Sequence, residues 1–129
     1  MYMDNTGKQL PTILYVDDEE INLDLFKLTF KKTFNVITAK SAKEGLQILR
    51  ERQIPLIVTD YRMPDMNGVK FIEEIKKESP ERICIIVTGF YESINEATEE
   101  LVYKLILKPW KKDEMIAVIQ SGIEIYNRQ

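Results

Sequence analysis

The stretch ILYVDD, residues 13–18, is an apolar run that ends in two adjacent carboxylates. It shows no alternation of polar and apolar residues, which predicts a strand buried on both faces of a parallel sheet. Three later strings also stop at a polar residue: LIVTD (56–60), ICIIVT (83–88) and LILK (105–108). In an open parallel sheet the carboxyl ends of the strands lie along one edge, where ligands bind. We therefore expect these polar residues to share one site.

Strands and helices are expected to alternate along the whole chain. In the first helix, Ile21, Leu25, Leu28 and Phe26 recur at helical spacing and indicate its apolar face. Strands that alternate with helices, joined by right-handed crossovers, predict a doubly wound, flavodoxin-like α/β fold. We expect five helices on a five-stranded parallel sheet in the order 2-1-3-4-5. The strands are expected at 12–16, 35–39, 56–59, 83–87 and 105–107, and the helices at 19–33, 41–52, 69–78, 94–100 and 112–126.

The composition is that of one soluble globular domain. The 129 residues are 44% hydrophobic and 30% charged, and we divide them into a polar arm at 1–11 and a domain at 12–128. A net charge of −3 gives no support for nucleic-acid binding. No apolar run approaches the roughly 20 residues that span a bilayer, and the arm lacks the pattern of a signal peptide. We expect a cytoplasmic protein.

The absence of histidine restricts the chemistry. It excludes Ser-His and Cys-His nucleophile pairs and imidazole metal sites. The single cysteine, Cys84, lies in an apolar run, so we expect a buried structural thiol and no disulfide framework. Any metal must be bound by oxygen, which indicates Mg²⁺, Mn²⁺ or Ca²⁺.

Asp17, Asp18 and Asp60 are expected to meet where the order of strands reverses, between the first and third strands. Gathered carboxylates raise one another's pKa unless a cation compensates, and Mg²⁺ suits a site with few carboxylates and a phosphate. The alternative for the adjacent pair is an acidic cluster that opens a helix. Asp60 is the natural nucleophile, because aspartate forms acyl-phosphates.

Thr88 and Lys108 would add a hydroxyl and an ammonium to the same edge. Lys108 can pair with Asp60 before modification and with a phosphoryl oxygen afterwards. Taken singly, each residue has a structural alternative: a capping aspartate, a strand-end threonine or a surface lysine. Their common position at strand ends is what favours a metal-assisted phosphoryl-accepting site.

Over nearly its whole length the chain resembles the CheY-like receiver domain of bacterial two-component response regulators. The segments that carry the resemblance are ILYVDDEEIN (13–22), IVTDYRMPDMNG (57–68), IIVTG (85–89) and LKPW (107–110). The resemblance implies that residues 12–128 form a signalling switch that is not an enzyme beyond self-directed phosphotransfer and autodephosphorylation.

The resemblance also implies a role for each site residue. Asp60 would accept a phosphoryl group from a sensor histidine kinase or a phosphotransfer protein, and Thr88 and Lys108 would contact that group. The cofactor would be Mg²⁺, bound directly by Asp18 and largely through water by Asp17. The metal ligands would be completed by Asp60 and the backbone carbonyl of Arg62.

One position departs from the family pattern. Receivers often carry Tyr or Phe three residues before the lysine, where this chain has Leu105. Tyr103 comes two residues earlier, on the same expected strand face but about 7 Å away. The usual coupling of the threonine to an aromatic ring is therefore not expected here. The loops after Thr88 and Lys108 would respond instead, with Phe90, Tyr91 or Trp110 as reporters.

The last expected helix carries two apolar stripes: Ile116, Ile119, Ile123 and Tyr126 in one, and Met115, Val118 and Ile125 in the other. One interpretation is a wide buried face. The other is a partner surface, for a homodimer or for an output domain following the chain. The sequence also bears on two other functions. An aspartyl-phosphate phosphohydrolase is disfavoured because D-x-D and a cap-sized insertion are absent, and a receiver-like interaction module would lack phosphorylation.

Overall fold

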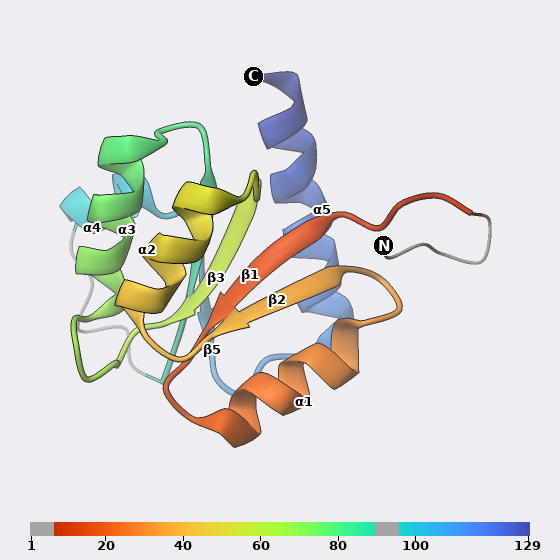
Figure 1. Cartoon of the computed structure of the whole chain (residues 1–129), viewed down its shortest axis with the longest axis horizontal. Helices are drawn as coiled ribbons and strands as arrows, with labels where there is room; N and C mark the ends of the chain where they lie inside the picture. Colours follow the sequence, from red (N-terminus) through yellow and green to blue (C-terminus); the bar gives the residue numbers. More distant parts are fainter. Residues whose placement is uncertain (1–6, 90–95) are drawn as a thin grey trace.

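The computed structural model describes residues 7–89 and 96–129. Five parallel strands form one sheet in the order β2-β1-β3-β4-β5. The order confirms the predicted doubly wound, flavodoxin-like topology (Figure 1). The strands are β1 (Thr12–Val16), β2 (Asn35–Ala39), β3 (Leu56–Asp60), β4 (Ile83–Thr88) and β5 (Lys104–Leu107).

Helices cover both faces of the sheet (Figure 1). α1 and α5 enclose one apolar cluster, and α2 and α3 enclose the other. Successive residues of β1 alternate between the two clusters, because neighbouring side chains of a strand point to opposite faces. The helices are α1 (Glu20–Phe30), α2 (Ala42–Glu51), α3 (Gly68–Glu78), α4 (Glu96–Leu101) and α5 (Lys112–Arg128).

Local side-chain hydrogen bonds set where α2 and α3 begin. Ser41 Oγ accepts from the backbone N–H of Glu44, and Asn67 Oδ1 accepts from that of Lys70. Each bond satisfies a helix N–H that has no partner within the helix. Asp65, in the loop after β3, adds a second cap to α2 by accepting from the backbone N–H of Lys43 at 2.9 Å. The loop that precedes α3 is therefore tied to α2.

The predicted apolar face of α1 is wrong at three of its four residues. Ile21, Leu25 and Leu28 are 79%, 53% and 63% exposed, whereas Phe26 is buried as predicted, together with Leu23 and Phe30. Both sets recur at helical spacing, so periodicity alone does not separate them. The side of α1 that carries Phe26 and Phe30 is buried because its aromatic rings fill more of the space over the sheet. Phe26 stacks on Tyr15 with ring centroids 3.9 Å apart.

The two stripes of α5 form one wide face. Met115, Ile119 and Ile123 are buried, and Ile116, Val118, Ile125 and Tyr126 are partly buried against the same cluster. Within this chain, the structure thus shows the wide, largely buried face. Cys84 is fully buried in β4, and burial raises the pKa of its thiol to about 12, as expected of a structural cysteine. Among the described residues, every helix is too short or too polar to cross a bilayer.

Candidate functional site

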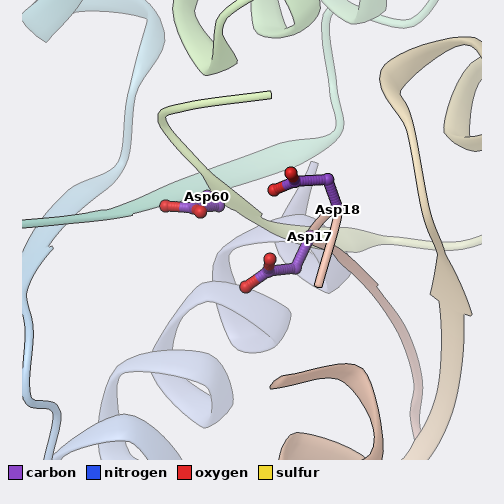
Figure 2. A group of neighbouring side chains, drawn as sticks. All are labelled: Asp17, Asp18 and Asp60. Atoms are coloured by element: carbon purple, nitrogen blue, oxygen red, sulfur yellow. The ribbon is translucent and has the colours of Figure 1, made fainter. Parts of the chain in front are cut away.

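Three carboxylates gather where β1 and β3 end (Figure 2). The two strands pair directly, with Val16 opposite Thr59, so the residues that follow them are neighbours. One carboxylate oxygen from each of Asp17, Asp18 and Asp60 lies within 4.8 Å of the others. Asp17 and Asp60 are buried and Asp18 is exposed. The cluster forms at the predicted switch point and has the all-oxygen donor set that suits a small divalent cation.

The Asp17 carboxylate is held by two donors from the protein. The Tyr15 hydroxyl donates to Oδ2 at 2.8 Å, and the backbone N–H of Glu19 donates to Oδ1 at 3.0 Å. Burial, followed by the charge of Asp17, raises the pKa of Tyr15 far above its ordinary value, so the hydroxyl remains a donor. Asp18 is exposed to solvent. This difference fits direct metal coordination by Asp18 and a more distant role for Asp17.

Asp60 forms an ion pair with Lys108, whose Nζ lies 3.1 Å from Oδ1. Burial raises the pKa of Asp60, Lys108 opposes the rise through its hydrogen bond and its charge, and Asp17 adds to it. The pKa is raised overall, because burial and the charge of Asp17 outweigh the ammonium of Lys108 and the backbone N–H of Tyr61. A second positive charge at this site would relieve the imbalance, and the cluster therefore fits a divalent cation.

β4 and β5 bring Thr88 and Lys108 to the same edge. Thr88 pairs with Leu107 in the sheet, and the backbone N–H of Lys108 donates to the Thr88 carbonyl at 2.9 Å. A cleft of about 480 Å³ opens there. It is lined by most of the predicted site residues, together with neighbours from the loops: Asp18, Glu19, Asp60, Arg62, Met63, Pro64, Thr88, Gly89 and Lys108.

Three residues were given no task by sequence reasoning, although two of them lie in the segment 57–68 that carries the family resemblance. Tyr15 holds Asp17, Asp65 ties the loop after β3 to α2, and Gly68 lies against the backbone of Asp60. A Cβ at residue 68 would come within 2.7 Å of the Asp60 carbonyl oxygen. The spacing of Tyr15 and Asp17, two residues apart at the end of a strand, was the one available signal, because it predicts a shared face.

The expected arrangement around Leu105 needs a correction. Tyr103 was expected on the same strand face as Leu105, but Tyr103 precedes β5 and packs against α5, where its hydroxyl lies 2.5 Å from Ser121 Oγ. Leu105 packs against the opposite cluster. The alternation of faces holds only within a strand, and Tyr103 lies outside it. Two expected reporters, Phe90 and Tyr91, lie outside the described residues.

Trp110, the third expected reporter, lies beside the site. Its ring packs against Phe30 at 5.3 Å and edge-on against Phe26 at 5.8 Å, so it joins the segment after Lys108 to α1. The peptide between Lys108 and Pro109 is cis.

The fold and the acidic strand ends define an open α/β domain with an acidic site at the carboxyl edge of its sheet, and comparison with known proteins assigns its family. The model of the response regulator receiver domain matches residues 13–120. The chain belongs to this family of two-component signalling domains, whose members act as phosphoacceptor switches.

Two curated relatives illustrate the match. The chain is 34% identical over 121 residues to the hydrogenase transcriptional regulatory protein HoxA of Cupriavidus necator, covering 92% of this chain and 25% of that one. It is 33% identical over 115 residues to the transcriptional regulatory protein GlrR of Escherichia coli, covering 87% and 26%. The chain thus spans about a quarter of the length of these relatives.

Solved structures agree with the fold. A response regulator receiver domain protein from Clostridium thermocellum shares 32% identity at a TM-score of 0.83, covering 89% of this chain and 95% of that one. A CheY-like receiver domain protein from Methanospirillum hungatei shares 25% identity at a TM-score of 0.82, covering 93% and 98%.

Proposed function

We propose that this receiver is a phosphorylatable switch in which Asp60 accepts a phosphoryl group from the phosphohistidine of a sensor kinase or phosphotransfer protein. The observation that carries the proposal is the position of Asp60. Its carboxylate lies between the acidic pair after β1 and the ammonium of Lys108, 3.1 Å away. A nucleophile between a cation site and a fixed ammonium suits phosphoryl transfer, in which charge spreads over the phosphoryl oxygens.

Each site residue has a defined task in the proposed reaction. A carboxylate oxygen of Asp60 attacks phosphorus, the new O–P bond forms as the N–P bond breaks, and the electron pair of that bond returns to the donor imidazole. Lys108 then pairs with a phosphoryl oxygen, and Thr88 donates its hydroxyl to another. Mg²⁺ supplies neutralisation of the phosphoryl charge when bound. Asp18, Asp60 and the backbone carbonyl of Arg62 would hold it, with Asp17 acting through water.

The donor protein is proposed to dock beside α1. A groove of about 700 Å³ runs along this helix and shares Lys108 with the cleft around Asp60. Leu25, Trp110 and Pro109 give its lining an apolar character, and Ile21 and Leu28 extend the apolar surface on α1. A donor that brings phosphohistidine to Asp60 must cover the adjoining surface. Exposed leucine and isoleucine beside the site supply an area whose burial stabilises such a complex.

No other chemistry is proposed for this chain. The later loss of the phosphoryl group would be hydrolysis of the aspartyl-phosphate, in which water attacks phosphorus and the Asp60 carboxylate leaves.

The alternative function is a receiver-like interaction module that is never phosphorylated. The two functions differ in one measurable property, the ability of Asp60 to form an adduct.

The test combines intact mass with fluorescence. The protein is incubated with Mg²⁺ and a small acyl-phosphate, or with beryllofluoride, while the fluorescence of Trp110, the single tryptophan, is followed. We expect a mass increase of one phosphoryl group with acyl-phosphate and a Mg²⁺-dependent change in fluorescence with both reagents. Asp60→Asn should show neither. Binding of Mg²⁺ without any adduct would favour the interaction module, and loss of Mg²⁺ binding as well would overturn the mechanism.

A further inference from the structure

Tyr15 joins the acidic cluster to the groove along α1. Its side chain is 2% exposed, lines the groove and donates through its hydroxyl to Asp17 Oδ2 at 2.8 Å. Neither the proposed phosphoryl transfer nor the sequence motifs give this hydroxyl a task. Its partner, however, is one of the three carboxylates of the metal cluster.

The hydroxyl meets a specific requirement of Asp17. Asp17 is fully buried, and a buried carboxylate needs hydrogen-bond donors to replace the water that it has lost. Among the described residues, two groups donate to its oxygens: the backbone N–H of Glu19 and the side-chain hydroxyl of Tyr15. They engage different oxygens, so together they restrict the rotation of the carboxylate. Substitution of Tyr15 would remove the side-chain donor and leave the Asp17 carboxylate with its backbone donor.

The ring of Tyr15 is itself fixed. It stacks on Phe26 with ring centroids 3.9 Å apart and an angle of 3° between the planes. Phe26 in turn contacts Trp110. A phenylalanine at residue 15 would retain this stack and lose only the hydroxyl. The position therefore allows the hydrogen bond to Asp17 to be removed with little change in packing.

We propose that Tyr15 is a positioning residue of the Mg²⁺ site: its hydroxyl holds the Asp17 carboxylate in place beside Asp18 and Asp60 and thereby raises the affinity of the cluster for Mg²⁺. The inference rests on the proposed function, because it assumes that the cluster binds the metal. Groups that orient metal ligands from behind typically change metal affinity by about 10–100-fold when removed. We expect Tyr15→Phe to lie at the lower end, about 10-fold, because Asp17 acts on the metal through water and keeps its backbone donor.

The test is a calorimetric titration of the full chain with Mg²⁺ at fixed pH and salt. Tyr15→Phe is compared with the wild type and with Tyr103→Phe. Tyr103→Phe is the control because it also removes a tyrosine hydroxyl that contacts another side chain, Ser121 Oγ at 2.5 Å. Tyr103 precedes β5, so it lies at the opposite end of that strand from the site. We expect a dissociation constant about 10-fold higher for Tyr15→Phe and an unchanged one for Tyr103→Phe.

Thermal unfolding separates positioning from a general structural role. Both variants are melted in a metal chelator and at a fixed Mg²⁺ concentration. A purely structural hydroxyl would lower the melting temperature in chelator and leave the gain produced by Mg²⁺ unchanged. We expect Tyr15→Phe alone to show a smaller gain from Mg²⁺, since a ligand stabilises the folded state according to its affinity.

The outcomes distinguish this inference from the proposed function. If the wild type binds Mg²⁺ and Tyr15→Phe binds it equally well, the positioning role is overturned and the phosphoacceptor proposal stands. An equal loss of affinity in Tyr103→Phe would also overturn it, because the effect would then be general. If the wild type itself binds no Mg²⁺, the proposed function is overturned, and the inference about Tyr15, which rests on it, is overturned as well.

Discussion

Gly68 is the position where one added methyl group should disturb the site most directly. A Cβ there would lie 2.7 Å from the carbonyl oxygen of Asp60 and 3.1 Å from Cα of Tyr61. Ordinary contact begins at 3.4 Å, so the backbone must move by about 0.7 Å (3.4 − 2.7). Because the nearest obstacles are backbone atoms, side-chain rotation cannot relieve the overlap. The residue that must give way is the proposed phosphoacceptor.

We expect Gly68→Ala to lower the free energy of unfolding by about 1–2 kcal/mol. Overpacking typically lowers stability by about 1–3 kcal/mol. The higher helix propensity of alanine at the start of α3 offsets at most about 1 kcal/mol of this loss. The rate of labelling by acyl-phosphate should fall more steeply. A misplacement approaching 1 Å costs on the order of 10–100-fold in reactions that depend on alignment.

Gly122→Ala is the matched control. A Cβ at residue 122 would also meet an atom at 2.7 Å, but that atom is Cδ1 of Leu56, the mobile end of a side chain in the cluster under α5. Urea denaturation gives the stabilities, and intact mass in the presence of Mg²⁺ and acyl-phosphate gives the labelling rates. We expect Gly122→Ala to label at the wild-type rate. Wild-type labelling by Gly68→Ala, or equal slowing by Gly122→Ala, would refute the reasoning.

Three further perturbations test the electrostatics and the docking surface. Lys108→Met removes the group that lowers the pKa of Asp60, so the pH midpoint of acyl-phosphate labelling should move upward and the rate at neutral pH should fall. Asp60→Asn should stabilise the metal-free protein at neutral pH by on the order of 1 kcal/mol, measured by thermal unfolding in a chelator. Because the folded-state pKa of Asp60 is raised, the wild type loses stability as pH rises through that pKa, and the advantage of the variant should shrink toward about pH 4. Leu25→Lys, on the exposed side of α1, should change stability by no more than about 0.5 kcal/mol, yet slow transfer from a phosphohistidine protein and leave labelling by acyl-phosphate unchanged.

Each expectation has a contrary result. An unshifted labelling midpoint in Lys108→Met would mean that the ion pair does not govern Asp60. If the higher stability of Asp60→Asn does not depend on pH, burial of the charge on Asp60 is not its cause. If Leu25→Lys accepts the phosphoryl group from the donor protein at the wild-type rate, the donor does not dock over the groove beside α1.

The prediction of the fold succeeded because its decisive features are local. A strand buried on both faces must be apolar at successive positions, as in 13–16 and 83–87, whatever lies next to it. The strand-end residues could be expected to converge for a related reason. In a parallel sheet the residues after the strands meet at one edge, so Asp60 and Lys108 could be brought together without knowledge of any contact.

The failures arose where two local patterns were equally good. α1 has apolar residues on two sides, and which of them joins Phe26 in the core depended on how well each side fills the space over β1: Phe30 is buried and Leu25 is exposed. Tyr103 was placed on the face of Leu105 by extending the alternation of the strand expected at 105–107 two residues toward the N-terminus. β5 begins at Lys104, so Tyr103 lies outside the strand and the alternation does not apply to it.

The sequence by itself determined the order of the elements, the strand topology and the set of polar residues at the carboxyl edge. These follow from periodicity and chain direction, which are properties of short segments. The tertiary structure decided which face of α1 is buried, which hydroxyl holds Asp17 and why residue 68 must be glycine. Those outcomes depend on side-chain volume and on backbone contact between segments. Local patterns alone do not decide them, because packing is settled only when all the elements are assembled in the same space.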